Sequence, residues 1–160
     1  MISSKKSLLF FFIVIFIFLS KIHSQQAQQV QNIPEDEVSY IGMTLRNLIE
    51  FLGSPISVHT ARGLEEWQDD VVFVYDEGDF YIYRNRVWQI GLISFRGINR
   101  GDTEPAVTEI LDSMPGLIRQ NSPQNSISYS MYERSWPMIL RCDFDDSGRL
   151  RGIFIFRSDL

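Results

Sequence analysis

The densest run of strand-forming residues in the chain lies at residues 71–95, VVFVYDEGDFYIYRNRVWQIGLISF. Val, Ile, Phe, Tyr and Trp dominate it, and two short polar segments at residues 76–79 and 85–86 interrupt it. Connections this short pair neighbouring strands antiparallel, because a parallel return needs a dozen residues or more. The sequence therefore predicts an antiparallel meander of three strands, at residues 71–75, 80–83 and 87–95.

A short helix is predicted just before this meander, at residues 45–52. Thr44 is a suitable N-cap, and apolar residues recur at i, i+3, i+4 and i+7 from Leu45. Gly53 and Pro55 then end the pattern. A helix of about this length is not stable alone, so it needs a sheet on which to pack its apolar stripe.

The helix and strands recur further along the chain. Gly101, Asp102 and Thr103 follow Gly42, Met43 and Thr44 at a shift of 59 residues. A second helix is predicted at residues 104–111. A polar loop then leads to strands at residues 127–133, 138–144 and 150–156. The predicted fold class is therefore α+β, with two tandem repeats at residues 40–96 and 97–160, each a short helix followed by a three-stranded antiparallel meander.

Two residue patterns carry a resemblance to a known family. Each helix follows Gly-x-Thr and ends at small residues, in GMTLRNLIEFLGSP and GDTEPAVTEILDSMP, and the strands after them contain RVWQI and GRLRGI. This resembles the exported modules of the SmpA/OmlA type, known from the outer-membrane assembly lipoprotein BamE, and their tandem relatives, the β-lactamase-inhibitory proteins. The resemblance covers residues 40–156 and implies an α+β module without catalytic residues whose sheet binds other proteins. The chain departs from BamE in its duplication and its lack of a lipidation Cys, and from the inhibitors in its lack of disulfides.

The N-terminus has the organisation of an export signal. Two lysines precede an unbroken apolar run of twelve residues, 8–19, and a short polar segment then ends at Ser24. A membrane-spanning helix needs about 20 residues, so this run is short for one. We predict a signal peptide at residues 1–24, cleaved between Ser24 and Gln25, with retention of the segment as an anchor as the alternative. A flexible Gln-rich leader at residues 25–39 is predicted to follow.

Net charge and cysteine content limit the possible binding partners and the possible cellular compartment of this chain. Cleavage removes three of the 15 basic residues and none of the 20 acidic ones, so the mature chain has a net charge of −8. Such a chain is repelled by nucleic acid and by anionic headgroups, and nucleic acid is excluded as a partner. Cys142 is the only cysteine, so no disulfide within the chain stabilises the exported fold. We expect a periplasmic or secreted protein without an integral membrane span after cleavage.

The residues that could carry chemistry each have a simpler structural interpretation. His59 is the only histidine after cleavage, and no nucleophile turn accompanies it. Cys142 falls on the inward side of a predicted strand, where apolar surroundings suppress thiol reactivity. Residues 143–148 resemble the start of a calcium loop, but Phe154 stands where a Glu ligand is required, and a hairpin turn selects the same residue types.

Residues 56–70 are predicted to form a loop or a short irregular helix that packs Trp67 against the edge of the core. Paired carboxylates for hydrolysis have to be held across a cleft, whereas a solvated loop of like charges is a much commoner arrangement of acids such as those at residues 65–70. The acids concerned are Glu65, Glu66, Asp69 and Asp70. We therefore predict no catalytic residue, metal site or cofactor, and the chain is not expected to be an enzyme.

A candidate partner surface follows from the predicted turn at residues 85–86. A two-residue turn there puts one set of side chains on the core face: Tyr81, Tyr83, Trp88, Ile90 and Leu92. The opposite face then carries the candidate partner-binding residues Phe80, Ile82, Arg84 and Gln89. The alternative is that Phe80 and Ile82 are covered by the other repeat or by residues 56–70. A change of one residue in the turn would also exchange the two faces.

The sequence thus predicts a non-catalytic exported protein-binding module, either an envelope-assembly accessory or an enzyme-inhibitor-like protein. The alternative is a small apolar-ligand carrier, or an enzyme, with a pocket between the two repeats. A third possibility is a structural envelope protein that binds only copies of itself. A binding module should leave an aromatic sheet face open to solvent, whereas a carrier should enclose an apolar cavity.

Overall fold

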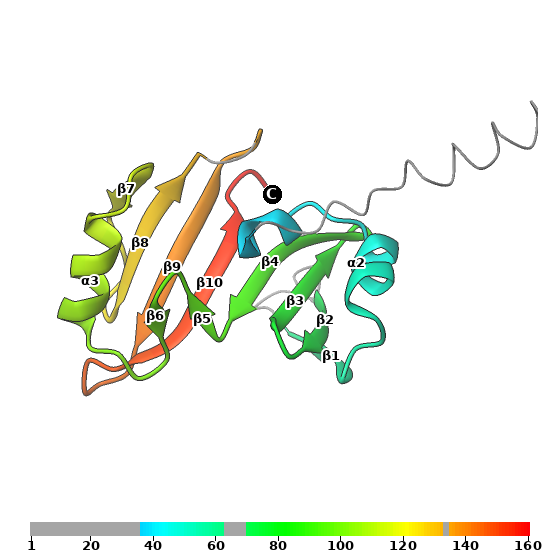
Figure 1. Cartoon of the computed structure of the whole chain (residues 1–160), viewed down its shortest axis with the longest axis horizontal. Helices are drawn as coiled ribbons and strands as arrows, with labels where there is room; N and C mark the ends of the chain where they lie inside the picture. The colour runs from blue at the N-terminus through cyan, green and yellow to red at the C-terminus, as the bar shows by residue number, and fades with distance from the viewer. Residues whose placement is uncertain (1–35, 63–69, 133–134) are drawn as a thin grey trace, which may run out of the picture. The chain divides into compact units, whose positions relative to one another are not determined.

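The computed structural model describes residues 36–62, 70–132 and 135–160, all within the unit Pro34–Leu160. Eight strands form one antiparallel sheet in the order β1-β2-β3-β4-β10-β9-β8-β7 (Figure 1). These strands are β1 (Ser57–Ala61), β2 (Asp70–Tyr75), β3 (Gly78–Tyr83), β4 (Arg86–Leu92), β7 (Leu117–Gln120), β8 (Ser126–Met131), β9 (Met138–Phe144) and β10 (Leu150–Arg157). The remaining elements are the hairpin β5 (Ser94–Phe95) and β6 (Ile98–Asn99), the 3-10 helix η1 (Glu37–Tyr40), and the helices α2 (Leu45–Leu52) and α3 (Glu104–Asp112).

This sheet corrects the predicted fold class. An α+β fold of two repeats, each a helix and a three-stranded meander, is wrong, because the protein is mostly one large sheet. Four of its strands follow each helix, and β4 pairs with β10 so that all eight strands are continuous. The sequence pattern misses β1 and β7 because these edge strands bury little and show no clear apolar alternation. The division of the chain between residues 96 and 97 stays a prediction.

The predicted positions of the two helices are confirmed. α2 begins after Thr44, whose hydroxyl oxygen accepts a hydrogen bond from the backbone N–H of Asn47 at 3.2 Å. It ends at Gly53, where φ is 82°. α3 begins after Thr103, whose side chain makes no capping hydrogen bond. The same residue type thus precedes both helices, but only one of the two threonines caps its helix.

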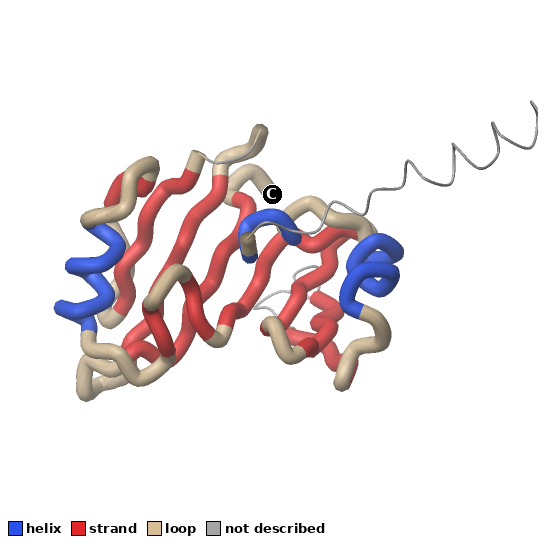
Figure 2. The backbone as a smooth tube through the Cα atoms, in the orientation of Figure 1, coloured by secondary structure: helices blue, strands red, loops and turns tan. Residues whose placement is uncertain are grey.

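Each helix packs an apolar stripe on the sheet and is tied to it by a tyrosine. The fully buried helix residues are Leu48, Val107 and Leu111. The hydroxyl of Tyr75 donates to the carbonyl oxygen of Gly53 at 3.3 Å, and that of Tyr129 donates to the Asp112 carboxylate at 2.6 Å. Figure 2 shows the two helices, in blue, at opposite ends of the sheet, with α3 beside β7.

The hairpin of β3 and β4 turns one residue earlier than predicted. Tyr83 pairs with Arg86, so the two turn residues are Arg84 and Asn85. Their φ values are 47° and 66°, and the tight two-residue turn between antiparallel strands requires such positive values. Because side chains alternate between the faces of a strand, this shift exchanges the predicted faces of β3: Phe80 and Ile82 lie on the helix side, and Tyr81 and Tyr83 lie on the other side.

A β-bulge in β4 then fixes which side chains lie together. The pairing shifts between Tyr81 and Ile82, whose partners are Gln89 and Val87. Trp88 is therefore the extra residue of the bulge, with no partner on β3. The bulge keeps Val87 on the helix side of the sheet and leaves Trp88 and Gln89 on the other side.

The buried core lies on the helix side. Phe80 is 0% exposed there and makes edge-to-face contacts with Tyr40 and Tyr75, at ring-centroid distances of 5.1 and 5.5 Å. In β9 every second residue is buried, and these residues are Met138, Leu140, Cys142 and Phe144. Buried residues of both helices and of the central strands form one hydrophobic cluster, so the sheet has one core along its length.

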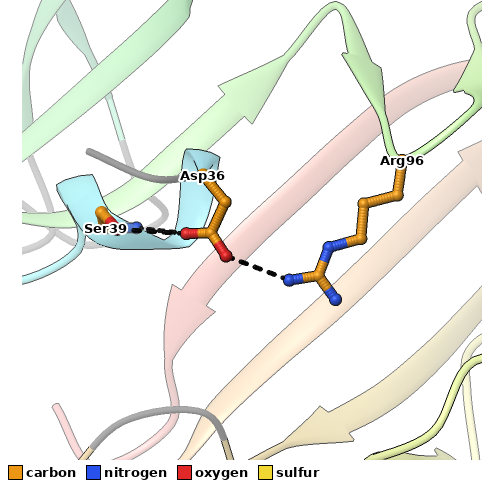
Figure 3. A network of polar contacts seen from close by, with 3 residues as sticks. All are labelled: Asp36, Ser39 and Arg96. Carbon is orange, nitrogen blue, oxygen red and sulfur yellow. Dashed lines mark hydrogen bonds and ion pairs between the residues drawn. The ribbon is translucent and has the colours of Figure 1, made fainter. Parts of the chain in front are cut away.

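Between the helices, η1 and the β5–β6 hairpin cover the same side of the sheet (Figure 1). Their fully buried residues are Val38, Phe95 and Ile98. Asp36 caps η1 by accepting hydrogen bonds from the backbone N–H and the hydroxyl of Ser39, both at 3.1 Å. Its second carboxylate oxygen lies 3.2 Å from Nη2 of Arg96 in the hairpin (Figure 3). This network joins the start of the described chain to the hairpin.

The N-terminal predictions fall largely outside the described residues. Residues 36–39 of the predicted leader belong to the fold, because η1 packs Val38 into the core. Residues 25–35, the signal at residues 1–24 and the cleavage site at Ser24 and Gln25 are not among the described residues. Within residues 36–62, 70–132 and 135–160, every helix is too short or too polar to cross a membrane.

Candidate protein-binding face

The side of the sheet opposite the helices, which we call the open face, carries two rows of side chains across β3, β4, β10 and β9. The first row is Tyr81, Gln89, Phe156 and Ile139. The second row is Asp79, Gly91, Phe154 and Arg141. All of these residues except Gly91 are half-buried, so solvent reaches both rows. An aromatic and partly charged surface therefore crosses the middle of the sheet.

Phe154 lies in a slot made by two glycines. Gly91 is its cross-strand partner on β4, and a Cβ atom at Gly91 would lie 3.4 Å from the Phe154 ring. A Cβ atom at Gly152, two residues earlier on β10, would lie only 2.6 Å from the ring, which is closer than real Cβ contacts. The ring thus lies low over the backbone of β4 and β10, and this keeps the middle of the open face shallow.

Arg141 stacks on both phenylalanines of this face. Its guanidinium carbon lies 5.2 Å from the ring centroid of Phe154 and 5.7 Å from that of Phe156. Its Nε atom lies 3.1 Å from Oδ1 of Asp143, but the geometry is not that of a hydrogen bond, and Nε is buried without an acceptor. The side chain remains 37% exposed. A guanidinium carries five N–H donors, so most of those of Arg141 are available to a partner.

Trp88 and Tyr81 add polar groups to the aromatic surface. The indole Nε1 of Trp88 donates to Oδ1 of Asp70 at 3.1 Å. Burial, together with the negative charges of Asp79 and Asp70, raises the pKa of Tyr81. The Tyr81 hydroxyl therefore stays neutral near pH 7 and remains able to donate a hydrogen bond.

A polar hollow of about 460 Å³ lies beside Arg141. Its walls are Pro123, Gln124, Asn125, Ser126, Arg141, Asp143, Phe144, Asp145, Asp146 and Arg151. Charged side chains of both signs line it, which favours polar ligands or polar partner side chains over apolar ones. The hollow thus extends the open face at its β8–β9 end.

The predicted partner-binding residues do not share one face. Phe80 is 0% exposed, and Ile82 is partly buried against the core cluster. Arg84 lies in the turn, where its guanidinium carbon is 5.1 Å from the ring centroid of Tyr83. Gln89 alone lies on the open face. The prediction that Phe80 and Ile82 face solvent is therefore wrong, because the earlier turn places both on the helix side.

The other residues considered for chemistry occupy structural positions. His59 is exposed on edge strand β1, and Cys142 is fully buried, where burial raises the pKa of its thiol to about 12. Asp145 closes the β9–β10 turn by accepting from the hydroxyl of Ser147 at 2.7 Å and from the backbone N–H of Arg149 at 3.0 Å. These hydrogen bonds hold the pKa of the Asp145 carboxyl below its usual value.

Among the described residues, no group of three or more His, Cys, Asp or Glu side chains is placed to hold a metal ion. Of the acids at residues 65–70, only Asp70 is described, and it accepts the hydrogen bond from Trp88. Glu65, Glu66, Asp69 and Trp67 lie outside the described residues.

The sequence pattern misses Phe154 and Phe156 as residues of the open face. Both stand in the run GIFIF of β10, where every residue after Gly152 is apolar. A strand with apolar residues on both faces shows no alternation that would separate its core side from its solvent side. The solvent side of β10 can be inferred only from its neighbour β9, where the polar residues Arg141 and Asp143 alternate with buried residues and so mark the solvent side.

Comparison with known proteins finds similarity to solved structures alone. No family model matches the chain, and no curated protein matches it. One similar solved structure is an extracellular protein containing an SCP domain from Bacillus anthracis, at 13% identity and a TM-score of 0.48, covering 78% of this chain and 46% of that protein. Another is a cysteine-rich secretory protein from Staphylococcus aureus, at 10% identity and a TM-score of 0.44, covering 79% of this chain and 47% of that protein.

The chain thus spans about half the length of both proteins. The fold corrects the resemblance seen in the sequence, because its sheet has eight continuous strands instead of two three-stranded meanders, and no family model matches the chain. The likeness to SmpA/OmlA modules and to β-lactamase-inhibitory proteins is therefore wrong, because a cap, an apolar stripe and tight turns are too general a pattern to identify a family.

Proposed function

We propose that this protein is an exported, non-catalytic module that binds another protein through the open face of its sheet. The observation that carries the proposal is the pair of half-buried rows around Arg141, Phe154 and Phe156. An aromatic surface with a guanidinium at its centre has the composition of a protein-binding surface.

The packing around Arg141 favours a protein partner. Tyr, Trp and Arg dominate the energetics of protein interfaces, and Tyr81, Trp88 and Arg141 all lie on this face. Stacking on two rings restrains the guanidinium before any partner arrives, which lowers the entropic cost of using its donors. The net charge of −8 for the mature chain disfavours nucleic acid as the partner.

A carrier of small apolar ligands has weaker support. The hollow beside Arg141 is lined by arginine and aspartate side chains, and an apolar ligand would desolvate these charges without pairing them. The aromatic side chains instead lie over the middle of the sheet, on a shallow surface that suits a protein.

Export is part of the proposal and rests on the apolar run at residues 8–19 and the small residue Ser24. The mature protein should begin at Gln25. N-terminal sequencing of material recovered from outside the cytoplasm checks this, and an intact Met1 in that material would contradict cleavage.

A photo-crosslinking amino acid placed at Ile139 tests the binding face in the native envelope. Ile139 is half-buried in the first row, and Glu109, exposed on α3, is the matched control position. We expect a discrete protein adduct from position 139 and none from position 109. In the double variant Arg141→Gln and Phe156→Ser, the adduct should be lost while the melting temperature stays close to that of the parent. Equal labelling from both positions, or an adduct that the double variant keeps, would exclude the open face as the binding site.

A further inference from the structure

β1 forms one edge of the sheet and is the least buried strand in it. Among the described strands it pairs only with β2. Ser57, Val58, His59 and Thr60 are all exposed, and Val58 is 51% exposed. Ile56, just before the strand, is 66% exposed. The outer side of this strand therefore presents backbone N–H and C=O groups to solvent beside apolar side chains.

The features that normally keep an edge strand from pairing are absent from residues 57–61. Proteins protect such edges with charged side chains, proline, bulges or very short strands. The sequence SVHTA has no charged residue and no proline, and β1 pairs with β2 in an unbroken register of five residues. An unprotected edge of this kind is a template for one more strand.

The opposite edge of the sheet is better protected. β7 has four residues, and one of them is Arg119, which lies 3.7 Å from the Asp112 carboxylate. Pairing β7 with a copy of itself would bring two Arg119 side chains near each other, whereas β1 carries no charge to repel its own copy.

We propose that β1 pairs antiparallel with β1 of a second copy of this chain, so that two eight-stranded sheets join into one. The composition of β1 favours a second copy as the partner. A two-fold axis places identical residues near each other, and because β1 has no Lys, Arg, Asp or Glu, this pairing brings no like charges together. The register that pairs all five residues puts His59 on the axis and Val58 opposite Thr60 of the other copy. In this register both helix sides lie on one side of the joined sheet, and both open faces lie on the other.

The test measures the molar mass of the exported protein over a concentration series by light scattering after size-exclusion chromatography. The parent protein should approach twice the chain mass as concentration rises. Val58→Lys places two like charges beside the axis and should keep the chain monomeric. Ile118→Lys, at the 56% exposed residue of β7, is the matched control and should dimerise as the parent does.

Thermal melting at low concentration separates lost pairing from lost folding, since both lysines replace exposed side chains and should leave the monomer melting temperature unchanged. A parent chain that stays monomeric throughout the series overturns the proposal. So does a dimer that Val58→Lys retains, or one that Ile118→Lys abolishes, because these outcomes place the contact elsewhere.

Discussion

Tyr129 joins α3 to the sheet through a single hydroxyl group. The residue is 1% exposed, and its O–H donates to Oδ1 of Asp112 at 2.6 Å. Burial, and the hydrogen bond to Asp112, raise the pKa of Tyr129, so the hydroxyl stays protonated throughout the neutral range. This donor therefore holds the end of α3 on the sheet at any pH in that range.

Replacing Tyr129 by Phe should lower the free energy of unfolding by about 1–2 kcal/mol, because the ring remains packed but the hydrogen bond to a carboxylate is lost. Urea denaturation measures the change. Tyr132→Phe is the control, since Tyr132 is 67% exposed and its change should stay within about 0.5 kcal/mol. Equal losses at the two positions would mean that the Tyr129 hydroxyl does not stabilise the fold.

At the scale of single elements, the two helix N-termini differ in a way that mutation can resolve. Thr44→Ala should cost about 1 kcal/mol, because it removes the hydrogen bond to the N–H of Asn47. Thr103→Ala should cost only a few tenths of a kcal/mol, because the side chain of Thr103 makes no capping hydrogen bond. Denaturant unfolding of the two single variants gives both numbers, and a larger loss at Thr103 would reverse the assignment of the caps.

The elements with strong local signals are predictable from the sequence. β2, β3 and β4 combine apolar, β-branched and aromatic residues with tight turns, and α2 combines a cap with an apolar stripe. The edge strands give no such signal, because β1 keeps four of its five residues exposed and needs no alternation. Joining the two halves into one sheet depends on the β4–β10 pairing, a contact between distant segments that local periodicity cannot show.

The candidate site is predictable only in part, because one residue decides the faces of the central hairpin. The turn at Arg84 and Asn85 exchanges the predicted faces of β3, whereas the bulge at Trp88 leaves Ile90 on its predicted core face. Arg141 is placed correctly on the solvent side by the alternation of β9. Phe154 could not be placed by the same reasoning, since both faces of β10 are apolar.

At the scale of the whole described unit, both helices and the central strands contribute to one hydrophobic cluster. A shared core predicts that neither half unfolds before the other. Trp88 lies in the first half of the chain, in β4, and Trp136 lies in the second half, just before β9. Tryptophan fluorescence therefore reports on both halves.

Leu48→Ala should destabilise the whole unit by about 2–4 kcal/mol, because Leu48 is 0% exposed and its loss leaves a cavity. Fluorescence and far-ultraviolet circular dichroism should shift together and remain one transition. Ile49→Ala, on the same helix at a 39% exposed site, should cost less than about 1 kcal/mol. Two separate transitions in Leu48→Ala would show that the halves unfold independently.

The pairing of β4 with β10 also has a consequence for how fast the chain reaches this structure. The other ladders of the sheet join strands that are close along the chain, whereas Leu92 meets Ile153 and Gln89 meets Phe156 across more than half of the described residues. Closing so large a loop lowers the entropy of the chain before the contacts between β4 and β10 can compensate for the loss. Formation of this ladder should therefore set the folding rate. Because β10 comes after both β4 and β9 along the chain and lies between them in the sheet, each of these two strands lacks one neighbour until β10 is present. Until then both strands expose an unpaired edge, and such edges make a partly folded chain prone to aggregation.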